Sequence, residues 1–224
     1  MAQHDPHRHL AQLDRWFRLD MPFARFLLHV LVVSLAGLVP VLALYVALAP
    51  GFTAHLAGDA AALGRFARQI VTNGLPVVVV VNFVGFVLFA ARGRRGAVAM
   101  LCIDLVARAV AFVGLHAVIY PASALWFDSF GGDPSQALRV MAPTLTQAAL
   151  FGNLSGVYLY AAVLGAAPLV IAVLAGPAGA GARRAPLAYL PFAWRMPALF
   201  ALAMLAYVAL VAALVTLIAH GLAG

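Results

Sequence analysis

Residues 70–96 read IVTNGLPVVVVVNFVGFVLFAARGRRG, a long apolar run that ends in three arginines within four residues. A helix needs about 20 residues, at 1.5 Å per residue, to cross the ~30 Å hydrocarbon core of a bilayer. No water satisfies the backbone there, and polar residues do not alternate with apolar ones. The run therefore predicts a transmembrane helix and not a barrel strand.

Four more runs of this kind bring the predicted spans to five, at residues 26–49, 70–91, 97–120, 148–174 and 197–220. Hydrophobic residues make up 65% of the 224 residues and charged residues only 9%, which is far from the composition of a soluble domain. Little chain remains outside the spans. We therefore predict an all-α, polytopic bundle of five transmembrane helices over residues 26–220.

The arginines predict the orientation of this bundle. Ten of them lie in the N-terminal arm, the second-to-third connection and the fourth-to-fifth connection, whereas the opposite loops hold only Arg65, Arg68 and Arg139. Basic residues accumulate on the cytoplasmic side, so the N-terminus is predicted to be cytoplasmic and the C-terminus periplasmic. The chain contains no Lys and no Glu, a bias typical of a GC-rich bacterial genome. The expected location is the bacterial inner membrane.

The connections carry helix signals of their own. In the arm, residues 1–25, Leu10, Leu13, Phe17 and Met21 would share one face of an amphipathic helix. Such a helix is expected to lie on the cytoplasmic headgroups, with docking to a partner as the alternative. In the outer loop, residues 121–146, the Asp-Pro pair at 133–134 predicts the start of a short interfacial helix.

Two charged residues lie inside the third predicted span. Asp104 and Arg108 are four residues apart, so they share a helix face and can pair. Arg108 falls near the bilayer midplane, and Asn82 in the second span falls at a similar depth. The first hypothesis is that the pair is a neutralised structural staple, and the second is that it lines a route for a solute or a proton.

A second polar layer is predicted toward the outside. Thr146, Asn153 and Tyr160 recur every seven residues, which would place them on one face of span four, and His116 reaches the same half of the bilayer. His116 and His220 form the one depth-matched histidine pair within the spans, and no pattern of further histidines supports a haem. No cofactor is predicted.

Gly152 and Gly156 have the small-xxx-small spacing that lets transmembrane helices approach closely. Span five carries a similar row at Ala206, Ala209 and Ala213. These rows predict that spans four and five pack on each other or on a second copy of the chain.

The sequence contains no paired carboxylates, no metal-ligand cluster, no phosphate-binding loop and no nucleophile with a neighbouring base. We therefore expect neither an enzyme nor a metal site. The arginines lie at span ends and not along one face with aromatics, so a nucleic-acid partner is not expected either. The expected partners are the lipid bilayer and other membrane subunits. The favoured function is a non-catalytic accessory or scaffold subunit of a membrane assembly, and the alternative is a small-solute or proton transporter that uses the Asp-Arg pair.

Overall fold

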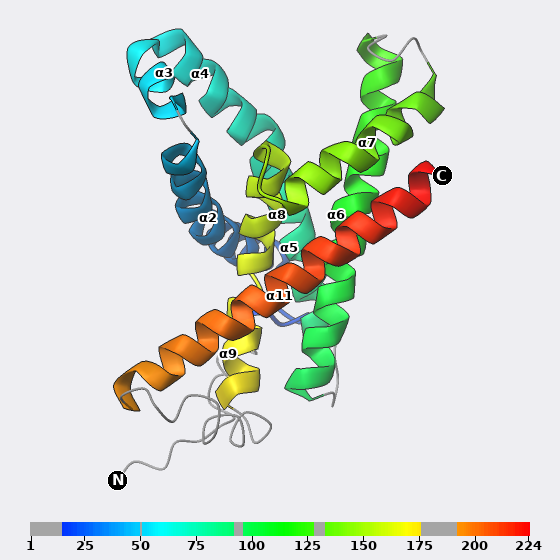
Figure 1. Cartoon of the computed structure of the whole chain (residues 1–224). Coiled ribbons are helices and arrows are strands. Elements are labelled where there is room, and N and C mark those ends of the chain that lie inside the picture. The colour runs from blue at the N-terminus through cyan, green and yellow to red at the C-terminus, as the bar shows by residue number, and fades with distance from the viewer. Residues whose placement is uncertain (1–14, 50, 92–95, 128–132, 176–191) are drawn as a thin grey trace.

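The computed structural model describes residues 15–49, 51–91, 96–127, 133–175 and 192–224, and these residues form helices and turns without strands (Figure 1). The predicted all-α class is confirmed for this part of the chain. The helices are α2 (Phe23–Leu48), α3 (Phe52–Gly58), α4 (Ala60–Gln69), the π-helical turn η1 (Ile70–Gly74), α5 (Leu75–Ala90), α6 (Ala97–Phe127), α7 (Pro134–Ala149), α8 (Leu154–Leu164), α9 (Ala167–Ala175) and α11 (Phe192–Ala223).

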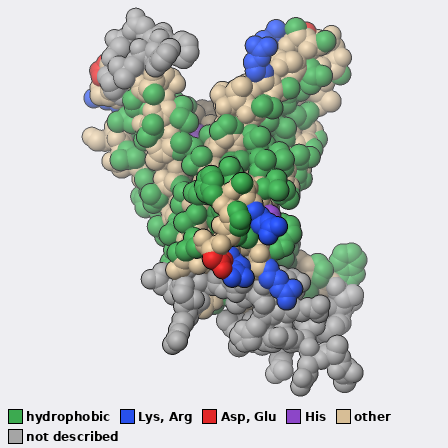
Figure 2. Space-filling view, turned by 180° about the vertical axis from the view of Figure 1, so that it is seen from behind, with side chains coloured by type: hydrophobic (Ala, Val, Ile, Leu, Met, Phe, Trp, Pro, Cys, Tyr) green, Lys and Arg blue, Asp and Glu red, His purple; other side chains and the backbone are tan. Residues whose placement is uncertain are grey.

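Five stretches of helix within the described residues are long and apolar enough to cross a membrane, which is compatible with a multi-pass membrane protein. They cover Phe23–Leu48, Ala60–Ala90, Ala97–Ser123, Leu154–Ala175 and Trp194–Ala223. The number of spans agrees with the prediction. Figure 2 shows why these helices suit lipid, since a broad hydrophobic surface lies between basic side chains gathered toward the ends.

The second candidate span, made of α4, η1 and α5, is longer than predicted and begins at Ala60, ten residues earlier. Asp59 caps it by accepting a hydrogen bond from the backbone N–H of Ala61 at 2.8 Å. The helix then widens into the π turn η1 just before Pro76, which has no N–H to donate to the helical ladder. The ring of Tyr158 packs on Gly74 in this turn, where any side chain would overlap it.

The outer loop and the start of span four differ from the prediction. Helix α6 continues to Phe127, and the predicted short interfacial helix is the 16-residue α7. Three side chains of α7, those of Met141, Leu145 and Ala148, are fully buried, so this helix packs into the bundle. A turn at residues 150–153 then interrupts the helix before α8 begins. The run at 148–174 was predicted as one span because hydropathy does not record such an interruption.

The described end of the N-terminal arm also differs from the predicted amphipathic helix. Its helical residues end at Trp16, and residues 17–22 form turns and bends. Phe17 is only 2% exposed and stacks on Phe86 of α5, with ring centroids 3.8 Å apart. His29 of α2 meets the backbone carbonyl of Trp16 at 2.7 Å. This part of the arm therefore packs on the bundle, and its location at the headgroups remains a prediction. Residues 1–14 of the predicted arm fall outside the described residues.

A close approach between backbones joins α2 of span one to α8 of span four. A Cβ atom on Gly37 would lie 2.5 Å from the carbonyl oxygen of Ala161, so the two backbones touch at this glycine. Helix α11 runs obliquely across the bundle and packs mainly on α7 and α6 (Figure 1). Its small residues Ala206, Ala209 and Ala213 are exposed and face away from the bundle.

Candidate functional site

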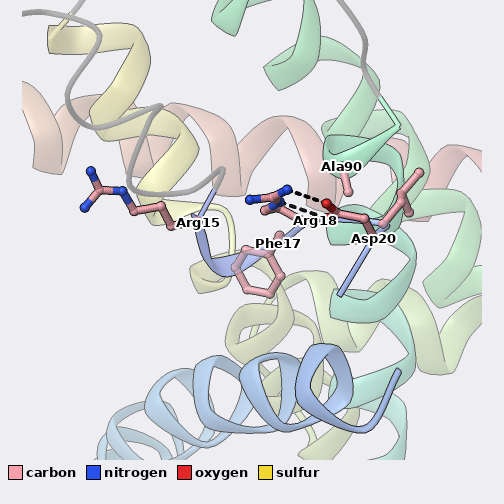
Figure 3. A pocket seen from close by; sticks show the side chains of 6 residues that line it. Arg15, Phe17, Arg18, Asp20 and Ala90 are labelled. Atoms are coloured by element: carbon pink, nitrogen blue, oxygen red, sulfur yellow. Dashed lines mark hydrogen bonds and ion pairs between the residues drawn. The ribbon is translucent and has the colours of Figure 1, made fainter. Parts of the chain in front are cut away.

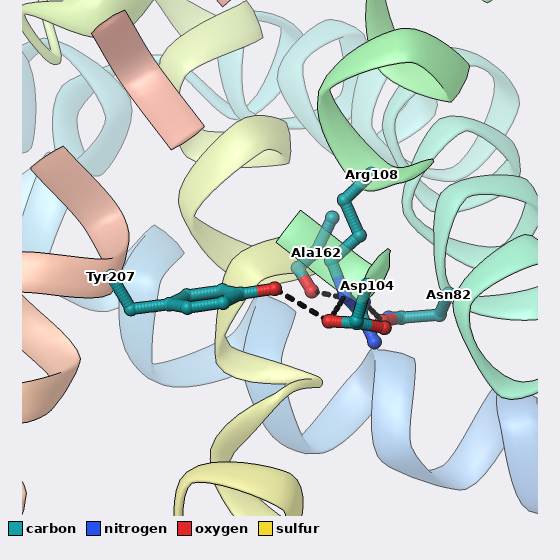
Figure 4. Close-up of polar contacts among 5 residues, drawn as sticks. All are labelled: Asn82, Asp104, Arg108, Ala162 and Tyr207. Atoms are coloured by element: carbon teal, nitrogen blue, oxygen red, sulfur yellow. Dashed lines mark hydrogen bonds and ion pairs between the residues drawn. The ribbon is translucent and has the colours of Figure 1, made fainter. Parts of the chain in front are cut away.

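The ion pair expected from the spacing of Asp104 and Arg108 is present on α6 (Figure 4). Nε of Arg108 donates to Oδ2 of Asp104 at 2.7 Å, within one helix turn. The two residues are 2% and 1% exposed, respectively. An unpaired arginine at such a site would be costly, and the neighbouring carboxylate neutralises it.

The pair is joined by groups from the other four spans. Arg108 Nη1 donates to the Asn82 side-chain carbonyl on α5 and, at 2.7 Å, to the backbone carbonyl of Ala162 on α8. Asn82 in turn donates to Ser34 Oγ on α2 at 3.0 Å. Tyr207 on α11 donates its hydroxyl to Asp104 Oδ2 at 2.5 Å. We call Ser34, Asn82, Asp104, Arg108, Ala162 and Tyr207 the buried polar network.

A break in span four makes the Ala162 carbonyl available. In a regular helix this oxygen would accept from the N–H of Ala166, but that N–H bonds to Val163 at 2.9 Å instead. Gly165 donates to Ala162 in a tighter turn at 3.1 Å, and α8 ends here. The interruption therefore leaves room on the carbonyl for the guanidinium, whose donors must find acceptors when buried.

Two glycines make space for the network. A Cβ atom on Gly85 would lie 2.6 Å from Asp104 Oδ1 and 2.7 Å from Arg108 Nη2. A Cβ atom on Gly165 would overlap the Asn82 side chain. The Arg108 guanidinium also lies 5.6 Å from the ring centroid of Phe86, a distance at which a cation–π contact adds stabilisation.

The network is enclosed by protein. Ser34 and Asn82 have no exposed surface, and the two charged residues have almost none. Two pockets on the described surface lie at the Arg15–Asp20 end of the molecule and beneath α3 and α4. Chemically, this arrangement satisfies a guanidinium and a carboxylate within the bundle and joins the five spans through one set of contacts.

The predicted outer polar layer is not one helix face, because a turn at residues 150–153 separates α7 from α8 in the middle of it. Asn153 caps α8 by accepting from Gly156 N–H at 3.0 Å, and it donates to the Thr144 carbonyl at 2.9 Å. Tyr160 donates to the Ala149 carbonyl on the other side of the turn. Thr146 lies before the turn, and its hydroxyl is 3.3 Å from Nε2 of His220. These residues hold α7, α8 and the end of α11 together.

His116 belongs to neither group. It is buried in α6, where Nδ1 contacts the Phe112 carbonyl of the preceding turn at 2.8 Å. His220, its predicted depth-matched partner, contacts Thr146 instead. Among the described residues, no group of three or more His, Cys, Asp or Glu side chains could hold a metal ion.

Gly152 and Gly156 do not form the predicted interface between helices. Gly152 lies in the turn at residues 150–153, where its N–H donates to the Gln147 carbonyl at 2.7 Å. A Cβ atom on Gly156 would lie 2.7 Å from the Ala148 carbonyl, so this glycine lets the end of α7 approach the start of α8. Both glycines serve the turn between α7 and α8, and Phe151 beside them adopts a positive φ of 59°.

Sequence reasoning found three members of the network and missed Ser34, Tyr207 and the Ala162 carbonyl. Ser34 and Tyr207 each carried a weak signal, since each is a polar group within an apolar run. The carbonyl carried none, because it is a backbone atom released by a break that hydropathy does not reveal.

Comparison with known proteins adds no family to this description. No protein-family model matches the chain, and neither a curated protein nor a solved structure matches it.

Proposed function

We propose that this chain is a non-catalytic accessory or scaffold subunit of a bacterial inner-membrane assembly, and that the buried polar network is the joint that holds its helices together. The observation that carries the proposal is the enclosure of the Asp104–Arg108 pair. Groups from α5, α8 and α11 contact the pair directly, Ser34 of α2 joins it through Asn82, and Arg108 is only 1% exposed. A group that handles a solute must meet water or the solute, whereas a structural joint is best kept dry.

The outer surface of α11 supports the scaffold role. Ala206, Ala209 and Ala213 form a row of small exposed residues on one side of this helix. Small residues let helix backbones approach closely in a membrane, where van der Waals packing drives association. A helix of another subunit, or of a second copy, could pack on this row.

A transporter is the second candidate, because ionisable residues inside a membrane often mark routes for protons or solutes. Figure 2 shows a hollow between the two arms that diverge at one end of the molecule. A transporter would need a path from this hollow to Asp104, and replacing the pair would then abolish transport.

The double replacement Asp104→Asn with Arg108→Gln separates the two functions. Either change alone strands a buried charge and should lower the free energy of unfolding by about 3–5 kcal/mol, measured by denaturant titration in detergent. The double variant should regain much of that loss. If the pair is a joint, the double variant should also keep its co-purifying membrane proteins. A stable double variant that loses those proteins, or loses a measured flux, would contradict the scaffold proposal.

Water access can be measured directly with Ser34→Cys in a Cys102→Ala background. A thiol at position 34 is almost the same size as the native hydroxyl, and it becomes a reactive thiolate only where water reaches it. A polar maleimide should therefore leave it unmodified in membranes. Ser135→Cys is the matched positive control, since Ser135 is exposed at the start of α7. Modification of position 34 at a rate similar to that of position 135 would favour the transporter.

A further inference from the structure

The buried ring of Phe17 fixes the position of the charged residues beside it. This ring stacks on Phe86 and meets the edge of Phe26, with centroids 5.6 Å apart in the second contact. The chain on either side of it therefore has a defined place at the end of α2 and α5. Arg15 and Arg18 lie on this stretch with exposed side chains (Figure 3).

Arg15 and Arg18 line a pocket with a volume of about 460 Å³, together with Phe17, Leu19, Asp20 and Ala90. Arg18 is paired with Asp20, and its Nε donates to Oδ1 at 2.8 Å. This hydrogen bond lowers the pKa of the Asp20 carboxyl, so the carboxylate is ionised at neutral pH. Two guanidinium groups and one carboxylate leave the pocket with a net positive charge.

A second pocket of about 180 Å³ shares Arg18 and Leu19 with the first, so the two adjoin. The remainder of its lining is apolar and includes Phe23, Phe83 and Val87. Phe23 is the first residue of the first span and is 68% exposed. The basic pocket therefore lies where headgroups lie, and the apolar pocket extends from it toward the hydrocarbon.

We propose that these two pockets bind one anionic glycerophospholipid. Its phosphate would contact Arg15 and Arg18, because guanidinium groups match phosphate oxygens in geometry and charge. One of its acyl chains would lie along Phe23, Phe83 and Val87. Basic pockets between helices at the membrane surface bind acidic headgroups in this way. The proposal does not depend on the scaffold function.

The test is lipid binding to the delipidated full-length chain in mild detergent, measured by native mass spectrometry. The probes are palmitoyl-oleoyl-phosphatidylglycerol, the phosphatidylcholine with the same chains, and glycerol 3-phosphate, which has no chains. One phosphatidylglycerol should bind per chain in preference to phosphatidylcholine. Each arginine near the surface contributes about fivefold to such a preference, so Arg15→Gln with Arg18→Gln should remove most of it. Glycerol 3-phosphate should not compete at equal concentration.

Two matched variants keep the test specific. Arg65→Gln with Arg68→Gln removes the same charge from α4 and should leave the preference unchanged. Val87→Trp should fill the apolar pocket and weaken binding of both lipids. If the variant that lacks Arg15 and Arg18 does not fold, Asp20→Asn provides the test. This change removes the carboxylate that competes with the phosphate for Arg18, so it should strengthen phosphatidylglycerol binding.

Several results would overturn the proposal. Equal binding of the two lipids would show that the arginines do not select a headgroup. An equal loss of preference in the α4 variant would show general charge attraction in place of a site. Effective competition by glycerol 3-phosphate would show a site for free phosphates. An Asp20→Asn variant without any gain in binding would show that Arg18 does not contact the phosphate.

Discussion

At the scale of single residues, Arg108 is held by partners of three different kinds. A carboxylate on its own helix neutralises its charge, a side-chain amide accepts from it across the bundle, and a backbone carbonyl accepts from it on a third helix. The carboxylate offsets the electrostatic cost of burying the guanidinium, and the amide and carbonyl oxygens accept hydrogen bonds from N–H groups that would otherwise have no acceptor. The network is therefore sensitive to any change that separates these partners.

The glycines beside the network give a prediction at this scale. Gly85→Ala and Gly165→Ala should each lower the free energy of unfolding by about 1–3 kcal/mol, because the added methyl group would push polar partners apart. Gly114→Ala is the matched control, since nothing lies within 4 Å of a Cβ atom there. That change in α6 should be neutral or stabilising by up to about 1 kcal/mol. Denaturant titration in detergent measures all three, and equal effects at the three positions would show that the network is loosely packed.

The sequence predicts part of this site for a clear physical reason. Asp104 and Arg108 lie on one helix, so the 3.6-residue period alone is enough to pair them. Asn82 follows from depth in the membrane. Tyr207 and Ser34 depend on how their helices rotate about their own axes, which depth does not specify.

At the scale of elements, α7 packs one face into the bundle and has a capped, exposed start. Asp133 accepts hydrogen bonds from the N–H and hydroxyl of Ser135 at 2.9 and 2.8 Å, and Pro134 follows it in the first turn. These are the cap and the proline that the sequence indicated. The length of the helix was not predicted, because the apolar residues of α7 recur on one face only and its overall hydropathy is modest.

The cap makes the stability of α7 depend on pH. The hydrogen bonds from Ser135 hold the pKa of the Asp133 carboxyl below its ordinary value of 3.8. The ionised form is thus favoured by folding, so its stabilisation is complete above pH 3.8 and is lost as the pH falls through the lowered pKa. Asp133→Ala should lower the thermal unfolding midpoint at pH 7. The control Asp133→Asn keeps a capping oxygen and should retain the midpoint at pH 7 but lose this acid-dependent part. If the unfolding midpoint of Asp133→Asn still falls at low pH as it does in the native chain, another group is responsible for the loss of stability in acid.

The turn between α7 and α8 shows where hydropathy fails for an element. Residues 148–174 are predominantly apolar, so they read as one span. The local signal was Asn153, a residue that often precedes a helix and caps it here. Small residues on both sides of it also fit a packing motif, but only Gly156 lies within α8, which begins at Leu154, and packing on a second copy remains a prediction.

At the scale of the whole molecule, the arms α3–α4 and α7 diverge at one end, and the helices converge on the buried polar network (Figure 1). The number of candidate spans was predictable because length and hydropathy decide it. The convergence was not, since it depends on close approaches at Gly37, Gly85 and Gly165. These glycines look ordinary in the sequence.

Orientation remains a prediction at this scale and can be measured with fusions. A cytoplasm-active reporter should work after Arg94 or Arg184, because arginines accumulate on that side. A periplasm-active reporter should work after Gly224 or within residues 129–135. A C-terminal fusion active only in the cytoplasm would contradict the predicted orientation with five spans.

The contacts of the network also set an order for biogenesis. In a chain that inserts its helices in order, α6 would enter the bilayer after Ser34 and Asn82 and before Ala162 and Tyr207 are synthesised. The carboxylate four residues away lets Arg108 enter as part of a neutral unit. Asp104 gains the hydrogen bond from Tyr207 only when α11 docks on the bundle. A chain truncated before α11 would lack the Tyr207 hydroxyl that donates to Asp104. We expect membrane quality control to recognise such a protein by the carboxylate that lacks this donor.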